Sequence, residues 1–268
     1  MSEINAHAVT PDKLGFSLVE LSIVLVILGL LVGGVLSGQS LIRAAELRAV
    51  TTEYSRYITA VQSFRDKYFA LPGDMSNAVK YWAQAAGGTA DGMDAACAAL
   101  LVASTTPTTC NGDGNGQISD IVYANNGYEV YRSWQHLANA GLIEGSYSGV
   151  RGALLFNPNP GTNTLKSKLS NAGYRLYYLG TASSGAYILS NYGHTIELKA
   201  WPSAATTLKP EEAWNIDTKL DDGKPYLGIV MSYLSAQTPN CTTADSTSGE
   251  YALTQSGKNC DLIMKTGF

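Results

Sequence analysis

One acidic residue inside a long apolar segment constrains this chain more than any other feature. After Glu20 there is no Asp, Glu, Lys or Arg until Arg43, and residues 16–42 are apolar enough to cross a bilayer as one helix. An acid at the centre of a bilayer costs roughly 2.5–3.5 kcal/mol, so an acid in such a helix indicates a function. Because the segment offers Glu20 no basic partner, we predict that this residue acts in assembly with another molecule.

The residues around Glu20 form a specific motif. The segment Lys13-Leu14-Gly15-Phe16-Ser17-Leu18-Val19-Glu20 resembles the processing site of type IV pilins and of the pseudopilins of type II secretion. This resemblance implies that a prepilin peptidase cuts after Gly15, that the new N-terminal Phe16 is methylated, and that Glu20 is needed for assembly. Weaker similarity extends to Leu71-Pro72-Gly73-Asp74, and the large C-terminal region is only loosely similar.

Cleavage also supplies a counter-charge for the buried acid. The free amine of Phe16 can neutralise Glu20 of a neighbouring subunit, because burying either charge alone is expensive and pairing relieves both. Two alternatives are an ordinary secretory signal peptide, cut near Ser37 or Gly38, and a plain signal anchor. The acid within the apolar segment and the nearly uncharged leader argue against both alternatives.

The pattern predicts one helix over residues 16–70 that changes character along its length. In its second half, apolar residues recur at three- and four-residue steps, while charged residues such as Glu53 and Arg56 occupy the polar positions. Close packing between membrane helices and local melting inside a filament are both open as reasons for the glycines of its first half, Gly29, Gly33, Gly34 and Gly38. The expected divisions are a leader, an apolar stem, an amphipathic helix and a head, at residues 1–15, 16–42, 43–71 and 72–268.

The predicted fold class is α+β, in which a head with an antiparallel β-sheet packs on the second half of the long helix. Asp74 is expected to cap a short helix through about Gln84, and further helices are expected at about 127–140 and from Pro210 to Asp221. The candidate strands lie between Gly, Asn and Ser clusters. They are Ala153–Phe156, Tyr174–Leu179, Ala186–Ser190, Thr195–Ala200 and Tyr226–Tyr233.

The four cysteines predict two disulfides, because an even number in an exported chain is typical of disulfide bonding. Four cysteines allow three pairings. Local pairing, Cys97–Cys110 with Cys241–Cys260, is favoured because each pair flanks a polar loop rich in Gly, Ser and Thr. The second pair also resembles the C-terminal disulfide loop of many pilins. Free or metal-bound thiols are the alternative, although no Cys-x-x-Cys occurs.

A polar loop at residues 111–120 has the spacing of a calcium site. Gly116 lies where an EF-type loop turns sharply, and Gln117 would offer its backbone carbonyl. The twelfth position is Val122, so the usual bidentate Glu is missing and Asp120 or a distant acid would have to complete the site. A Gly/Asn turn without metal is the alternative. The candidate calcium ligands are Asn111, Asp113, Asn115, Gln117 and Ser119.

A second group of acids, Asp217, Asp221 and Asp222, falls at the end of the predicted helix that begins at Pro210. Acids at a helix C-terminus oppose the helix dipole, so a lysine, backbone amides or a cation should offset them. A hydrogen-bonded structural turn is favoured over a metal site for these three residues.

Composition and motifs restrict the function further. Only 15% of residues are charged, the net charge is −4, and there is no basic block of the kind that a nucleic-acid binder shows. The chain contains no Gly-x-Ser-x-Gly, no phosphate-binding Gly-rich loop and no His-Glu-x-x-His. We therefore predict neither nucleic acid as a partner nor enzymatic activity, and no required cofactor beyond a possible structural calcium.

These observations predict a mechanical and adhesive role. We interpret the chain as a major or minor subunit of a type IV pilus-like filament, and a type II secretion pseudopilin is the alternative. The expected partners are further copies or other pilins, the prepilin peptidase and the inner-membrane assembly platform. The precursor is expected to span the inner membrane once before it joins a periplasmic or extracellular filament. An alternative of another class is a monomeric membrane-anchored binding protein.

Overall fold

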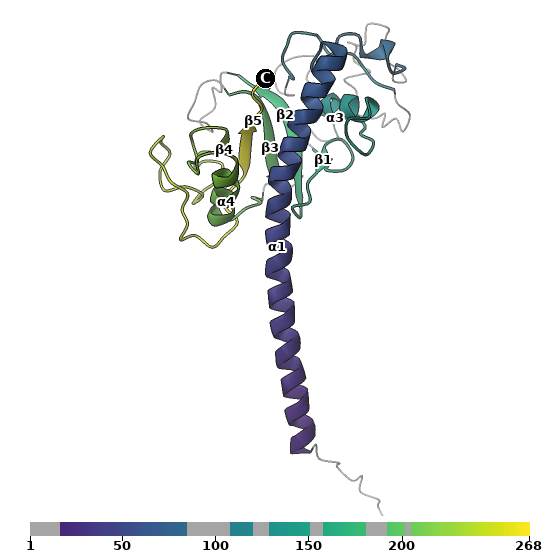
Figure 1. Cartoon of the computed structure of the whole chain (residues 1–268). Coiled ribbons are helices and arrows are strands. Elements are labelled where there is room, and N and C mark those ends of the chain that lie inside the picture. Colours follow the sequence, from purple (N-terminus) through teal and green to yellow (C-terminus); the bar gives the residue numbers. More distant parts are fainter. Residues whose placement is uncertain (1–16, 85–107, 120–128, 151–157, 181–191, 202–204) are drawn as a thin grey trace, which may run out of the picture. The chain divides into compact units, whose positions relative to one another are not determined.

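A computed structural model describes residues 17–84, 108–119, 129–150, 158–180, 192–201 and 205–268. The chain divides into two compact units, Met1–Ala45 and Glu46–Phe268. Helix α1, Leu18–Tyr68, begins in the first unit and ends in the second (Figure 1). The predicted helix over residues 16–70 is therefore confirmed within the described part of the chain, and the leader lies outside it.

The first unit is a helix with apolar side chains on all sides. The large apolar residues from Leu18 to Ile42 are exposed, and α1 is long and apolar enough to cross a membrane. Its most apolar stretch of 18 residues has a mean hydropathy of 2.6, and none of that stretch is buried. Such a surface is unfavourable in water and requires lipid or other protein around it.

The second unit contains a five-stranded sheet with the order β1-β2-β3-β5-β4, and every pairing is antiparallel. The predicted α+β class with an antiparallel sheet is thus confirmed. The predicted strands Tyr174–Leu179 and Thr195–Ala200 correspond to β2 and β3, which each begin two residues earlier. Strand β4 is shorter than the predicted strand Tyr226–Tyr233. The sequence does not predict β1 or β5. The predicted strands at 153–156 and 186–190 lie outside the described residues. The strands are β1 Leu165–Lys166, β2 Ala172–Leu179, β3 Gly193–Ala200, β4 Val230–Ser232 and β5 Leu262–Lys265.

The two longer helices of the head match the prediction, and the short one does not. Helix α3 spans Glu129–Asn139 and α4 spans Pro210–Leu220, with Pro in the first turn as the sequence indicates. The helix predicted from Asp74 to Gln84 is wrong, because turns and a single 3₁₀ helix, Ala78–Lys80, occupy that stretch. Asp74 does not cap a helix there, since its carboxylate accepts hydrogen bonds from a distant loop.

The core of the second unit lies between α1 and one face of the sheet. Alternate residues of β2 and β3, among them Tyr174 and Ile196, are fully buried in the same cluster as Val61 and Phe64 of α1. Aromatic rings join the layers, because the Tyr57 ring lies 5.7 Å from Trp134 of α3 and 5.3 Å from Tyr174, both edge to face. This packing explains the apolar period of the helix's second half.

One residue of that half departs from the sequence interpretation. Glu53, which the pattern assigned to a polar position, is buried. Its carboxylate accepts hydrogen bonds from the Ser167 hydroxyl at 2.7 Å, the Tyr174 hydroxyl at 2.8 Å and the Lys168 N–H at 3.0 Å. Glu53 therefore ties α1 to the β1–β2 hairpin, and partners more than a hundred residues away in sequence satisfy its charge.

A disulfide joins Cys241 to Cys260, which have Cα atoms 5.1 Å apart. Cys110 is also disulfide-bonded, and its predicted partner Cys97 lies outside the described residues. The closed loop 241–260 precedes β5 directly, so the bond anchors a central strand of the sheet as well as the loop.

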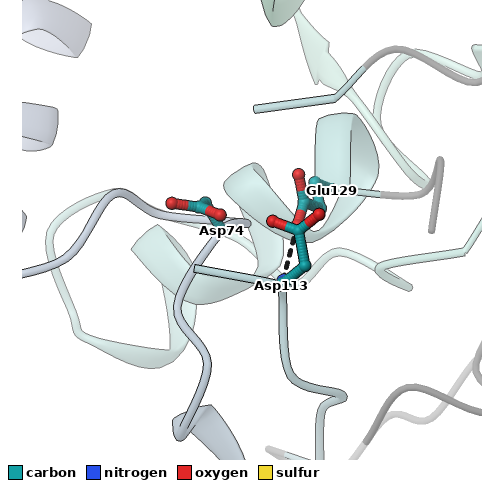
Figure 2. A group of neighbouring side chains, drawn as sticks. All are labelled: Asp74, Asp113 and Glu129. Carbon is teal, nitrogen blue, oxygen red and sulfur yellow. Dashed lines mark hydrogen bonds between the residues drawn. The ribbon is translucent and has the colours of Figure 1, made fainter. Parts of the chain in front are cut away.

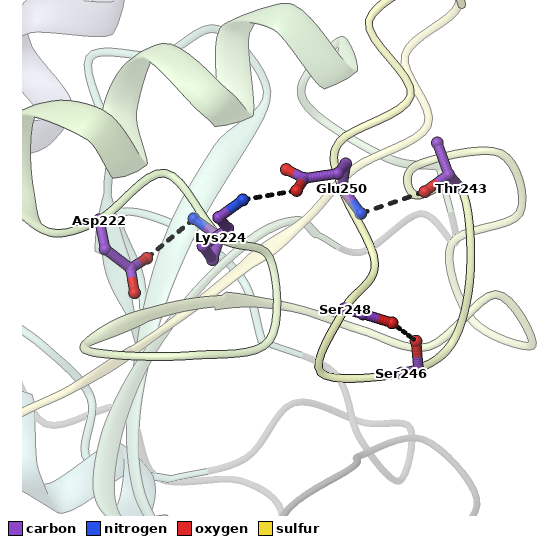
Figure 3. Close-up of polar contacts among 6 residues, drawn as sticks. All are labelled: Asp222, Lys224, Thr243, Ser246, Ser248 and Glu250. Atoms are coloured by element: carbon purple, nitrogen blue, oxygen red, sulfur yellow. Dashed lines mark hydrogen bonds and ion pairs between the residues drawn. The ribbon is translucent and has the colours of Figure 1, made fainter.

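Polar contacts also hold the loop 241–260, which the disulfide closes. Figure 3 shows Lys224, in the turn after α4, paired with Glu250 of the loop. The Glu250 N–H donates to the Thr243 hydroxyl at 3.1 Å, and the hydroxyls of Ser246 and Ser248 lie 3.0 Å apart. Exposed ion pairs of this kind contribute little, so the disulfide is the stronger constraint on the loop.

Candidate functional site

The assembly residue predicted from sequence lies in the first turn of α1. Glu20 is exposed, and its Oε2 accepts a hydrogen bond from the Ser17 N–H at 2.9 Å. No described residue forms an ion pair with Glu20. The predicted processing residues Gly15 and Phe16 lie outside the described part of the chain. Among the described residues, the carboxylate therefore has a local backbone donor and no ion-pair partner, and it can still accept a cation from elsewhere.

A second candidate site lies in the head, where three carboxylates from separate segments meet. Asp74, Asp113 and Glu129 each place a carboxylate oxygen within 4.8 Å of the others (Figure 2). Asp74 follows α1, Asp113 belongs to the predicted calcium loop, and Glu129 is the first residue of α3. The sequence predicts Asp113 as a ligand, and the missing acid at position 122 indicates that a distant acid is needed. The sequence does not identify Asp74 or Glu129 as that acid.

The loop folds around two of these carboxylates through its backbone amides. The N–H groups of Asn115 and Gly116 donate to the two oxygens of Asp74, both at 3.0 Å. The N–H groups of Asp113 and Ser119 donate to the two oxygens of Glu129, at 2.9 and 2.8 Å. The turn requires glycine at position 116, where φ is +82°. Glu129 thus links residues 113 and 119 of the loop, and Asp74 holds its central turn.

A glycine also brings the loop into contact with the segment after α1. A Cβ atom on Gly112 would lie 2.3 Å from the Gly73 carbonyl oxygen, which is closer than any side chain tolerates. In the same region the N–H of Gly112 donates to the Met75 carbonyl at 2.8 Å. This close approach of two backbones places Asp113 beside Asp74.

Burial and mutual repulsion perturb the titration of the cluster. Asp74 is 4% exposed and Glu129 is 0% exposed. Burial, together with the neighbouring Asp113 carboxylate and against the opposing effect of the Gly116 and Asn115 amide donors, raises the pKa of Asp74 to about 6. Burial likewise raises the pKa of Glu129 to about 7, with smaller contributions from the charges of Asp113 and Asp74. A proton or a cation at this cluster therefore relieves an electrostatic cost.

The remaining side chains of the predicted calcium loop have local partners. The Asn111 side-chain oxygen accepts from the Val79 N–H at 3.0 Å, and the Asn115 oxygen accepts from the Gln117 N–H at 2.7 Å. The Asn115 amide also donates to Asp113 at 2.8 Å. Gln117 is exposed, and Ser119 contributes its backbone N–H to Glu129. Three carboxylates thus lie together at this site, and the side-chain amides of Asn111 and Asn115 mainly stabilise the turn.

The second acidic group, Asp217, Asp221 and Asp222, also brings oxygens within 4.8 Å of one another. Each acid nevertheless has its own donors. Asp217 accepts from the Tyr251 hydroxyl at 2.9 Å and the Gly223 N–H at 3.1 Å. Asp221 accepts from the amides that begin β4, and Asp222 accepts from the Lys224 N–H at 2.8 Å (Figure 3). Burial raises the pKa of Asp217 to about 7. The contacts describe a hydrogen-bonded turn.

Comparison with known proteins identifies the N-terminal segment. The family model described as the prokaryotic N-terminal methylation motif matches residues 11–36, which include Gly15, Phe16 and Glu20. No curated protein and no solved structure matches the chain. The motif implies prepilin peptidase processing and filament assembly in general, starting from a membrane-anchored precursor. The chain has a pilin-like α+β architecture and carries the methylation motif that is characteristic of type IV pilins and pseudopilins.

Proposed function

We propose that this protein is a structural subunit of a type IV pilus-like filament. The observation that carries the proposal is an exposed apolar helix with one acid near its start, within a methylation motif. The same helix anchors the precursor in the inner membrane and later forms the filament core. The second unit, Glu46–Phe268, which contains the head, then lies on the filament surface, where it makes the contacts with other cells or surfaces.

The assembly step follows from the charge on Glu20. Cleavage after Gly15 creates an ammonium group on Phe16, and that group of an incoming subunit pairs with Glu20 of its neighbour. In apolar surroundings an unpaired carboxylate is costly and a paired one is not, so only the correct axial register is stable. Methylation of Phe16 keeps the positive charge, because a secondary amine is still protonated at neutral pH.

Mass spectrometry of the mature protein tests the processing. The N-terminus is expected to be N-methylated Phe16. A chain cut near Ser37 would instead support a secreted protein, and an uncut chain would support a simple anchored binding protein, which is the alternative of another class.

Substitution of Glu20 tests the assembly role. The variant Glu20→Ala should be processed normally and should yield no filaments in sheared surface material viewed by electron microscopy. The matched control is Glu46→Ala, which removes an acid from the same helix outside the apolar segment and should assemble normally. Normal filaments from Glu20→Ala would remove the role assigned to this residue.

The choice between a pilus and a secretion pseudopilus is tested by deleting the gene. Loss of surface filaments with normal export of secreted enzymes supports the pilus. Loss of enzyme export without a change in surface filaments supports the type II secretion pseudopilin. Filaments that contain this chain as their main component would make it a major subunit.

We also propose that the loop at 111–119 holds a structural calcium ion. Its oxygen spacing and the meeting of Asp74, Asp113 and Glu129 support this, because calcium prefers hard oxygen ligands and several carboxylates. The rival arrangement is a proton shared within the cluster, which the raised pKa values favour equally. The effect of added calcium on the melting temperature at pH 8 separates the two.

A further inference from the structure

A pocket of about 950 Å³ lies in the second unit, and its lining residues do not include Glu20. The end of α1, the turn at Gly114 and Gly116, strands β2 and β3, and Phe268 all contribute to its wall. Its size falls within the range of pockets that hold small ligands, roughly 300–1,000 Å³. The charged and ring-bearing side chains at this pocket include Arg65, Asp66, Phe69, Tyr178, His194 and Phe268.

Phe69 is the most unusual residue of this pocket. It follows α1 directly, its side chain is 94% exposed, and its φ of +53° lies in the left-handed region. The other non-glycine residues with positive φ in the described chain are Asn171 and Asn240, and asparagine tolerates this conformation. Glycine is the usual residue at this position after a helix. A strained and fully exposed aromatic ring at a pocket indicates a function for the side chain.

Packed ring side chains line another part of the pocket. The Tyr178 and His194 rings lie 5.1 Å apart, the His194 and Phe268 rings 5.5 Å apart, and the Arg65 guanidinium lies 5.4 Å from the Phe268 ring centre. The His194 Nε2 accepts from the Ile118 N–H at 3.2 Å, while Nδ1 lies 3.2 Å from the Phe268 carbonyl and donates to it. Both ring nitrogens are therefore occupied, and the wall is preformed around a neutral imidazole.

The charged groups of the pocket have both signs. Arg65 and Asp66 are exposed at the end of α1, and both line the pocket. A purely anionic ligand would meet Asp66, and a purely cationic one would meet Arg65. A ligand with one charge of each sign can pair with both kinds of group while its body contacts the rings.

We propose that this pocket binds a small zwitterion with an aromatic or apolar body, which is the chemistry of a free hydrophobic amino acid. The ligand carboxylate pairs with Arg65, the ammonium group pairs with Asp66, and the apolar body lies against Phe69 and Tyr178. The proposal goes beyond filament assembly and does not depend on it, because every residue involved belongs to residues 46–268.

Calorimetric titration of the full-length protein in detergent micelles tests the ligand class. The probes are L-phenylalanine, phenethylamine, which lacks the carboxylate, and 3-phenylpropionate, which lacks the ammonium group. L-Phenylalanine should bind at least tenfold more tightly than either of the other two. Equal affinity for the three probes, or no binding of L-phenylalanine, would overturn the proposal.

The variant Phe69→Gly tests the residue that drew attention to the pocket. It should raise the melting temperature of the head, because glycine relieves the backbone strain, and it should weaken L-phenylalanine binding at least tenfold. The matched control is Asn171→Gly, which changes another left-handed position outside the pocket and should leave binding unchanged. Unchanged binding in Phe69→Gly contradicts the proposal, as does a lower melting temperature, which would make Phe69 a packing residue.

A third variant separates this proposal from the filament function. Glu20→Ala should bind L-phenylalanine like the wild type even though it forms no filaments. If binding disappears together with assembly, the pocket is not a property of the single subunit and the proposal is wrong.

Discussion

Residues with raised pKa values make the head sensitive to pH. Asp74 and Glu129 have folded-state pKa values of about 6 and about 7, against ordinary values of 3.8 and 4.5. The buried Asp261 behaves similarly, since burial raises its pKa to about 7. For a raised pKa, the folded state binds more protons than the unfolded state between the two values. The stability that this difference contributes is complete below about pH 4 and is lost as the pH rises through 6 to 7.

We therefore predict that the melting temperature of the calcium-free protein falls between pH 5 and pH 8. Glu129→Gln should flatten this dependence, because the neutral amide that replaces the carboxyl group does not titrate. Scanning calorimetry in chelator at several pH values measures the effect. Glu144→Gln is the control, since the Glu144 side chain is 92% exposed and should have no influence.

The same titration tests calcium. A bound ion should raise the melting temperature at pH 8 and have little effect at pH 5, where Asp74 and Glu129 are mainly protonated. If added calcium changes nothing at pH 8, the calcium proposal fails.

At the scale of elements, Glu53 is the main polar link between α1 and the sheet. Glu53→Ala leaves two hydroxyls and one backbone amide of the β1–β2 hairpin without their acceptor, so it should destabilise the head by roughly 3 kcal/mol. Urea unfolding followed by tryptophan fluorescence measures the loss. Ser63→Ala changes an exposed position of the same helix and should stay within about 0.5 kcal/mol of the wild type. A similar loss in both variants would show that Glu53 has no special role.

The edge of the sheet gives a second prediction at this scale. The Asp221 carboxylate accepts hydrogen bonds from the amides of Ile229 and Val230, so it occupies donors at the start of the edge strand β4. Asp221→Ala should destabilise the head by about 1–2 kcal/mol and promote self-association, because free edge amides pair with other strands.

Unfolding in urea and light scattering detect these two effects of Asp221→Ala. The adjacent Asp222→Ala is the control, because Asp222 is exposed and accepts only from the local Lys224 N–H. Equal behaviour of the two variants would argue against edge protection by Asp221.

At the scale of the whole molecule, the two units differ in character. The proposed assembly charge, Glu20, lies on the exposed apolar part of α1 in the first unit, whereas the described residues of 46–268 form their own core. Glu20→Ala should therefore abolish filaments while leaving the melting temperature of the head within about 1 °C of the wild type, as expected for a surface substitution. A marked drop in that temperature would mean that Glu20 supports folding and not assembly.

How far the structure could be predicted depends on how local each signal is. The long helix, α3, α4 and strands β2 and β3 follow from periodicity and breaking residues within their own segments. Strand β5 is not predicted, because it is only four residues long and its strand conformation depends on its pairing with β3 and β4. The helix expected after Asp74 does not form. The carboxylate that would have capped it accepts hydrogen bonds from backbone amides of a loop that lies about forty residues away in sequence.

The sequence by itself determined the processing motif, the apolar stem with its solitary acid, and the class of the head, because these depend on composition and spacing along one segment. Only the tertiary structure decided that Glu53 is buried, that Asp74 and Glu129 join Asp113, and that Phe69 stands strained at a pocket. The physical reason is the same in each case. Burial, pKa and backbone strain depend on neighbours that are distant in sequence, and a local pattern carries no record of them.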